Sequence, residues 1–180
     1  MDKFWIRSAV PNDAQRMAEI LVTAQRAVFS GLVPEKCLDF PVEESRRNWR
    51  ETLIENESSQ EFLLLVAENE AGLVIGYGMW SEGSRHPDFA SELRVLMVDP
   101  AWQRQGIGRL LVQRGATFYQ KQDMGTMLVG VLKINPNTVF YEQLGAELVE
   151  ERPYTWEGFQ TIEWLYGWNN LERLINRRGR

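Results

Sequence analysis

The amino-acid sequence predicts an α/β (α+β) fold, in which helices cover a sheet. In the first half of the chain, two apolar runs, Phe62 to Glu68 and Gly72 to Trp80, flank a short Gly-containing segment that is typical of a hairpin. In the second half, a run from Glu92 to Val98 leads into a helical pattern over Gly106 to Gln122, and a further strand, Leu128 to Leu132, follows. Hairpins early and strand-helix-strand units late indicate a mixed sheet.

The elements before this hairpin follow from residue periodicity. Phe4 to Ala9 has the composition of a strand, and Asn12 or Asp13 can cap the helix after it. Glu43 to Glu55 is the second predicted helix. The apolar residues of the first helix recur at three- and four-residue steps, at Met17, Ile20, Leu21 and Ala24.

The end of the chain contains three further predicted elements. Asn137 to Leu144 is a short helix, and Ala146 to Arg152 and Gln160 to Trp168 are strands. Within the last of these strands, alternate aromatic residues form a stripe typical of a core or of a dimer interface, so a homodimer is one alternative. Without an internal repeat or a linker, the sequence predicts one domain over residues 1–180.

Length, cysteine content and charge limit the class of protein. A chain of 180 residues can bury a sizeable core, and one cysteine, Cys37, allows no internal disulfide. No apolar stretch approaches the roughly 20 residues that cross a bilayer, and the first residues do not resemble a secretory signal. The formal net charge of −5 argues against a nucleic-acid surface. We therefore expect a cytoplasmic protein with neither a membrane nor a nucleic-acid partner.

The loop before the helix at Gly106 has the chemistry of an anion site. Pro100 ends the preceding strand because it lacks the amide donor of the ladder. Gly106 and Gly108 carry no Cβ, so an anion can approach the main chain and the backbone can take a positive φ. Free first-turn amides and the helix dipole favour negative charge by roughly 0.3 to 1 kcal/mol. Arg104 and Arg109 add positive charge on either side of the glycines.

Two other phosphate-binding loops do not match this segment. A nucleotide P-loop requires Gly-Lys-Ser/Thr, whereas Gly108 is followed by Arg109 and Leu110. A dinucleotide fingerprint requires a third glycine and an acidic residue about twenty positions later. The remaining alternative is a Gly-rich turn that caps the helix and binds no ligand.

Two motifs in this half of the chain resemble those of a known enzyme family. Gln103-Arg104-Gln105-Gly106-Ile107-Gly108 resembles the Gln/Arg-x-x-Gly-x-Gly/Ala signature of the GNAT superfamily of N-acetyltransferases. About thirty residues later, Asn135-Pro-Asn-Thr-Val-Phe-Tyr-Glu-Gln-Leu-Gly145 is similar to the family's Asn and Phe-Tyr-Glu-x-Leu-Gly segment. The resemblance implies a GNAT-like, mostly antiparallel sheet of six to seven strands flanked by about four helices. It also implies direct acetyl transfer from acetyl-CoA to an amine, without a metal.

The same resemblance implies the residues that bind acetyl-CoA. The loop would hold the pyrophosphate, and backbone groups of the central strand, which is bulged in the family, would bind the pantetheine and the thioester oxygen. Asn135 would also bind the pantetheine, although Asn137 competes for this role and either could cap the short helix. The implied cofactor-binding residues are Met97, Val98, Gln103, Arg104, Gln105, Gly106, Ile107, Gly108, Arg109, Asn135 and Tyr141.

Two residues are the candidates for proton transfer. Tyr141 resembles the family's phenol near the coenzyme sulfur, and a phenol can donate a proton to a developing thiolate. Glu92 lies 14 positions before Gly106, where some members that acetylate lysine have a catalytic base. An ordered water chain, Glu82 or His86 are alternative bases.

The sequence does not decide whether the acceptor amine belongs to a small molecule or to a protein. Its site is expected to be built by the first two helices, by the loop that joins them, Phe29 to Val42, and by an irregular segment from Arg152 to Gly158. Cys37 has no visible His partner, so an acyl-enzyme is not expected. Two rival hypotheses are an acyl-CoA-binding sensor of the same fold without turnover, and an interaction domain that does not bind the coenzyme.

Overall fold

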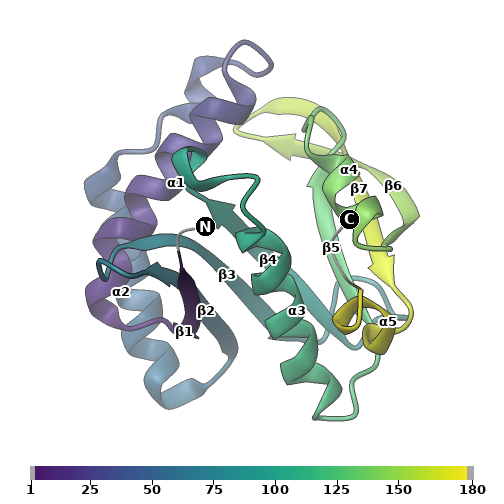
Figure 1. Ribbon diagram of the computed structural model, residues 1–180. Coiled ribbons are helices and arrows are strands. Elements are labelled where there is room, and N and C mark those ends of the chain that lie inside the picture. Colours follow the sequence, from purple (N-terminus) through teal and green to yellow (C-terminus); the bar gives the residue numbers. More distant parts are fainter. Residues whose placement is uncertain (1–2, 178–180) are drawn as a thin grey trace.

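The computed structural model describes residues 3–177 and arranges seven strands in one sheet (Figure 1). The expected domain of residues 1–180 therefore includes residues 1–2 and 178–180, which lie outside the described part. The spatial order of the strands is β1-β2-β3-β4-β5-β7-β6. Their bounds are β1 Phe4–Ser8, β2 Phe62–Asn69, β3 Val74–Glu82, β4 Ser91–Val98, β5 Met127–Leu132, β6 Glu147–Trp156 and β7 Phe159–Trp168.

The sheet is mixed and mostly antiparallel, as predicted. Every neighbouring pair is antiparallel except β4 and β5, which are parallel. A parallel pair needs a long crossover, and the chain between β4 and β5 supplies it as a helix. The α-helices are α1 Ala14–Phe29, α2 Val42–Ser59, α3 Ile107–Gln120, α4 Thr138–Gln143 and α5 Leu171–Ile175.

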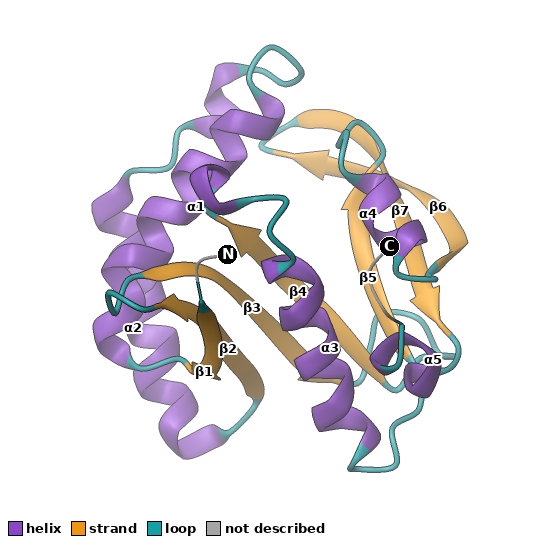
Figure 2. Ribbon diagram, viewed as in Figure 1, coloured by secondary structure: helices purple, strands orange, loops and turns teal. Residues whose placement is uncertain are grey.

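Helices cover both faces of the sheet (Figure 2). On one face α1 and α2 pack on β2 and β3, where Met17 and Ile20 of α1 are fully buried beside Val66 and Tyr77. The predicted periodicity of α1 is confirmed, because its apolar stripe faces this core. Asp13 precedes α1, but its carboxylate accepts the amide of Val10 at 2.9 Å instead of capping the helix.

The opposite face is covered by α3, α4 and α5. Leu111 and Ala116 of α3 are fully buried against the sheet, where Trp80 lies at the centre of the cluster. The aromatic stripe of β7 also belongs to this core, with Tyr166 and Trp168 at 1% and 2% exposure. This face therefore accounts for the stripe without a dimer interface.

The C-terminal part differs from the sequence prediction at two places. β6 continues to Trp156, so most of the segment expected to be irregular, Arg152 to Gly158, is a strand. The strand ends in a tight turn because Glu157 and Gly158 both have positive φ, 47° and 75°. Helix α5 was not predicted, because five residues are too few for a periodic signal. No helix within residues 3–177 is long and apolar enough to span a membrane.

Candidate active site

The site begins where β4 and β5 separate. Their parallel pairing joins only Ser91–Leu93 to Met127–Val129, although β4 continues to Val98. Figure 1 shows the two strands diverging beyond this contact. From Arg94 to Val98, the edge of β4 that faces away from β3 has no neighbouring strand among the described residues. Its backbone groups are available to an extended ligand arm.

A β-bulge marks the point of separation. Met79 pairs with Val95 and Trp80 with Leu93, so Arg94 is the extra residue in β4. A bulge bends its strand and leaves the extra residue unpaired in the ladder. The predicted bulge in the central strand is thus confirmed.

The loop after β4 forms a cradle of backbone amides at the start of α3. Gly106 has φ 87°, and a Cβ there would point into open space. Asp99 accepts the amide of Ala101 at 2.9 Å and pairs with Arg16 of α1, which fixes the start of the loop. The amides of residues 105–109 have no acceptor within residues 3–177, as expected of a helix start. This arrangement suits an anion.

Two arginines give the cradle its charge. Arg104 has φ 63°, and neither Arg104 nor Arg109 forms an ion pair with another described residue. Two unneutralised guanidinium groups beside free amides match the charge of a pyrophosphate. The residues present therefore fit the phosphate end of a coenzyme.

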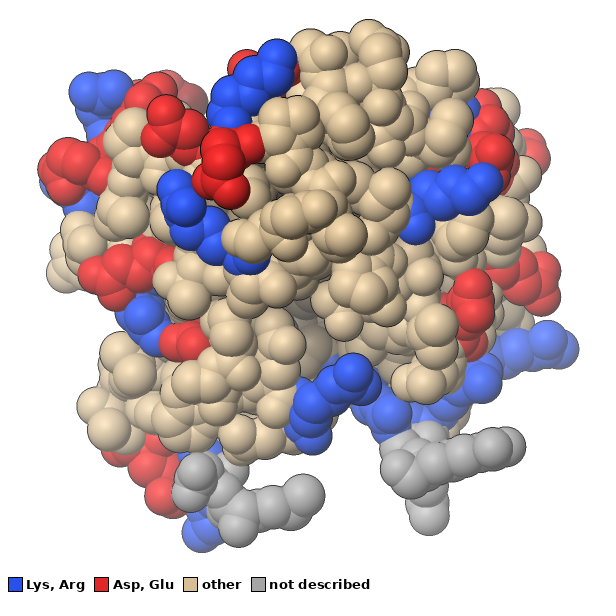
Figure 3. Space-filling model, turned by 90° about the horizontal axis from the view of Figure 1, so that it is seen from above, with Lys and Arg blue, Asp and Glu red and all other residues tan. Residues whose placement is uncertain are grey.

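A cleft of about 340 Å³ joins the cradle to the open edge of β4. In it the structure brings together α1, the end of β4, the glycine loop and the start of α4. Figure 3, a view from above, shows the surface hollowed between the two sides of the molecule. The lining residues are Ala24, Gln25, Val28, Phe29, Leu96, Met97, Val98, Trp102, Gln103, Arg104, Gly106, Ile107, Gly108, Arg109, Asn135, Asn137, Phe140, Tyr141 and Gln143.

The comparisons with known proteins agree with this geometry. Residues 60–145 match the family model described as an acetyltransferase (GNAT) domain. The chain is 27% identical over 177 residues to YuaI, an uncharacterized N-acetyltransferase of Bacillus subtilis (strain 168), covering 96% of this chain and 98% of that protein. Residues 60–145 thus match a GNAT acetyltransferase domain, and the chain as a whole is similar to an N-acetyltransferase. This protein is an acetyl-CoA-dependent acyltransferase.

Solved structures show the same GNAT fold. PaiA N-acetyltransferase of Thermoplasma acidophilum, solved in complex with coenzyme A, superposes with a TM-score of 0.75 at 15% identity, over 92% of this chain and 98% of that chain. YncA of Salmonella typhimurium, solved with its cofactor acetyl-CoA, has a TM-score of 0.66 at 20% identity, over 93% and 94%.

The cleft contains most of the coenzyme-binding residues predicted for this protein. Gln105 lies in the loop but does not line the cleft. Gln103 donates its side-chain amide to the carbonyl of Val98 at 3.2 Å, which ties the loop to the end of β4. The first helix was expected to help build the acceptor site, but sequence analysis did not single out Gln25, which lines the wall formed by α1. The close spacing of Ala24 and Val28 on one helix face was the available signal.

Asn135 and Asn137 both line the cleft. The Oδ1 atom of Asn135 accepts the backbone amide of Asn137 at 2.8 Å. Asn137 precedes α4, and its side chain makes no capping bond within the described chain. Both side-chain NH2 groups therefore stay available to a ligand.

Tyr141 reaches the same cleft from α4. Its ring is half-buried, stacks at 6.3 Å from the ring of Tyr166, and meets Phe140 edge-on at 5.1 Å. Burial raises the pKa of Tyr141 to about 12, because the phenolate is poorly solvated there. The phenol thus keeps its proton at neutral pH and can act as a donor.

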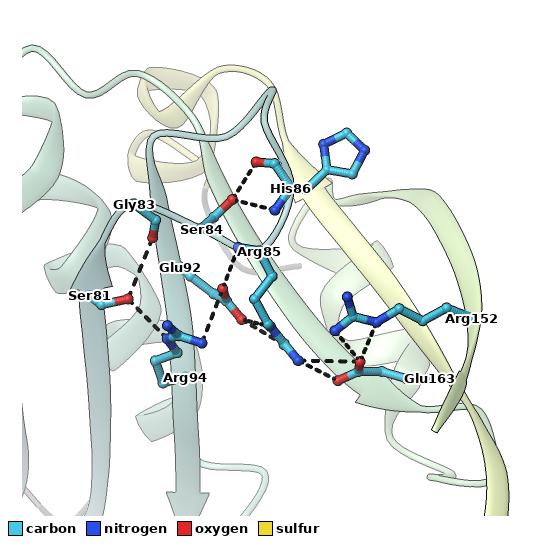
Figure 4. A network of polar contacts seen from close by, with 9 residues as sticks. All are labelled: Ser81, Gly83, Ser84, Arg85, His86, Glu92, Arg94, Arg152 and Glu163. Carbon is cyan, nitrogen blue, oxygen red and sulfur yellow. Dashed lines mark hydrogen bonds and ion pairs between the residues drawn. The ribbon is translucent and has the colours of Figure 1, made fainter. Parts of the chain in front are cut away.

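The structure places Glu92 away from this cleft. Its side chain is fully buried, and its carboxylate accepts the amide of Arg85 at 3.1 Å and the Nε of Arg85 at 2.6 Å (Figure 4). Arg94 lies 3.4 Å from the other carboxylate oxygen. Glu92 does not line the cleft, and its carboxylate is engaged by two guanidinium groups in the sheet.

The two alternative side-chain bases also lie outside the cleft. Glu82 ends β3, where it borders a separate hollow with Tyr119. His86 lies in the loop between β3 and β4, with its ring edge-on to Phe89 at 5.5 Å.

Proposed function

We propose that this protein transfers the acetyl group of acetyl-CoA directly to an amine, with both substrates bound at once. The observation that carries this proposal is the shared cleft, in which an anion cradle, an open strand edge and a protonated Tyr141 lie together. α1 forms the opposite wall of the cleft, where the amine would bind beside the coenzyme in a ternary complex.

Each part of the cleft is proposed to hold one part of the coenzyme. The amides of residues 105–109, together with Arg104 and Arg109, would hold the pyrophosphate. The edge of β4 at Met97 and Val98 would hold the pantetheine arm, helped by Asn135 or Asn137. When bound, acetyl-CoA supplies a thioester that an amine can attack.

Tyr141 is the proposed general acid. Its phenol lines the cleft and keeps its proton, so it can protonate the thiolate that leaves. Cys37 is an unsuitable nucleophile, because it is fully buried and its thiol donates to the carbonyl of Trp156 at 3.3 Å. Both observations support direct transfer.

Calorimetric titration with acetyl-CoA, followed by thiol release against a panel of amines, tests the proposal. We expect saturable binding, amine-dependent thiol release, and intersecting lines in initial-velocity plots of one substrate against the other. Parallel lines would indicate an acyl-enzyme. Binding without release for every amine would favour the acyl-CoA sensor.

Gly106→Asp tests the cradle itself. A carboxylate at this position would face the pyrophosphate, so we expect the dissociation constant for acetyl-CoA to rise at least about 100-fold. Gly72→Asp is the matched control, because Gly72 has φ 76° and equally open surroundings but lies in the β2–β3 turn. Equal loss of binding in the two variants would show that backbone strain, and not the cradle, is responsible.

A further inference from the structure

The described side chains that line the cleft carry positive charge but no negative charge. Within residues 3–177, no carboxylate, imidazole or thiol side chain belongs to its lining. Its charged side chains are Arg104 and Arg109, both at the cradle end. The pyrophosphate would neutralise these two, and a cationic acceptor would find no side-chain countercharge in this lining.

The two buried acidic side chains beside the joint of β4 and β5 do not supply a countercharge either. Glu92 and Glu163 are buried and paired with Arg85, and Arg152 also pairs with Glu163 at 2.6 Å (Figure 4). In Figure 3, basic side chains border one end of the hollow, and the acidic side chains on this face lie away from it. The cleft therefore favours an acceptor that enters without a positive charge.

One polar atom in the α1 wall lacks a partner. Oε1 of Gln25 is buried and accepts no hydrogen bond from the described residues. Gln25 lines the cleft between the apolar side chains of Ala24 and Val28, and Met97 lines it from the end of β4. A buried acceptor without a donor is destabilising, so a ligand N–H at this point would be stabilising. A neutral amine has such an N–H.

The ordinary acidity of amines distinguishes two classes of acceptor. An α-amino group has a pKa of about 8, so roughly one molecule in ten is neutral at pH 7. A lysine side chain has a pKa of about 10.4, and fewer than about one in a thousand is neutral. Without a base in the cleft, the first class presents a nucleophile at least about 100 times more often.

We propose that the acceptor is an α-amino group next to an apolar side chain, and that Gln25 positions it by accepting an N–H on Oε1. This inference rests on the proposed transferase function and names its substrate class. Gln25 is a positioning residue, while Tyr141 protonates the leaving thiolate. The bond formed joins the amine nitrogen to the acetyl carbon as the carbon–sulfur bond breaks, and the proton released by the amine returns through solvent to Tyr141, which restores the phenol.

Leucyl-lysine amide offers both kinds of amine to the full-length protein in one molecule. We expect mass-spectrometric mapping at pH 7 to find acetylation of the α-amino group at least about 100-fold faster than of the side chain, after subtraction of the uncatalysed rate. Equal or faster acetylation of the side chain would overturn the inference and leave the transferase function intact. Coenzyme binding without acetylation of either amine would also overturn it, whereas absent coenzyme binding would overturn the proposed function.

Gln25→Leu tests the positioning role. We expect the KM for leucyl-lysine amide to rise about 10-fold, because one hydrogen bond to the amine is lost, with kcat within about twofold and the dissociation constant of acetyl-CoA unchanged. Gln15→Leu is the control on the same helix, since the exposed Gln15 donates to Glu19 at 2.8 Å and does not line the cleft. A KM equal to that of the control would refute the role of Gln25.

Discussion

The two glycines of the cradle act through different physical effects. Gly106 is required by its backbone, because φ 87° is strained for any residue with a Cβ. Gly108 has an ordinary φ, but a Cβ there would lie 3.3 Å from Cζ of Phe140. The first glycine thus shapes the amide cradle, and the second lets α4 approach α3. This close approach brings Tyr141, the neighbour of Phe140, to the cleft.

Tyr141→Phe tests the proposed acid at the residue scale. We expect kcat to fall about 10- to 100-fold while the dissociation constant for acetyl-CoA stays unchanged, since only the proton donor is removed. Tyr154→Phe, at an exposed position of β6, is the control and should keep full activity. Unchanged kcat in Tyr141→Phe would exclude the phenol from proton transfer.

The pH profile gives an independent measure of the same residue. Burial raises the pKa of Tyr141 to about 12, so the phenol is protonated and competent below that value and is lost as a donor only as the pH rises through it. We expect kcat/KM to rise with pH as the acceptor amine loses its proton, without a descending limb between about pH 7 and about pH 10. If kcat/KM of the unmodified protein fell between about pH 7 and about pH 10, and that of Tyr141→Phe did not, the result would contradict the raised pKa of Tyr141.

At the scale of elements, α3 packs closely on the sheet because Gly115 has no side chain. A Cβ at Gly115 would lie 2.4 Å from Cε2 of Trp80, which is fully buried in β3. Close helix–sheet contact of this kind places the N-terminus of α3 directly above the end of β4. The glycine in the middle of α3 therefore positions the cradle from two turns away.

Gly115→Ala should lower the free energy of unfolding by about 1 to 3 kcal/mol, because Trp80 cannot move without disturbing the core. Urea denaturation followed by tryptophan fluorescence measures this change. Gly125→Ala is the control, since a Cβ at this loop position meets nothing within 4 Å. Equal stability of both variants would mean that α3 shifts freely on the sheet.

At the scale of the whole molecule, an ionic cluster bridges the two sides of the divided sheet. Arg85 follows β3 and pairs with Glu92 of β4 and Glu163 of β7, passing over Gly130 of β5 (Figure 4). Direct pairing of β4 with β5 covers only three residue pairs. The cluster thus reinforces the joint from which the cleft opens.

Arg85→Met should destabilise the protein by about 2 to 4 kcal/mol, because two buried carboxylates lose a shared partner. Arg46→Met removes an exposed pair with Glu43 on α2 and should leave the free energy of unfolding nearly unchanged. Chemical denaturation of both variants is the measurement. A loss no greater than that of the control would show that Arg94 and Arg152 suffice to neutralise the carboxylates.

Local sequence patterns predicted most elements. The hairpin of β2 and β3, the helix α3 and the aromatic stripe of β7 follow from spacing and turn residues, which act over a few positions. The last residues of β6 pair with the start of β7 across a tight turn, whereas helix α5 is held by contacts distant in sequence. Gln113 of α3, for example, donates to the carbonyls of Leu174 and Ile175 at the end of α5.

The sequence by itself determined the fold class, the glycine cradle and the candidacy of Tyr141, because each depends on backbone conformation or residue type at short range. Only the tertiary structure decided that Glu92 belongs to an ionic cluster and that Gln25 faces the cleft. Arg85 and Glu163, which hold that cluster with Glu92, are 78 positions apart, and Gln25 lies some seventy positions before Val98. The burial and charge around a side chain depend on such distant neighbours, and these set whether a carboxylate acts as a base or as a structural anion.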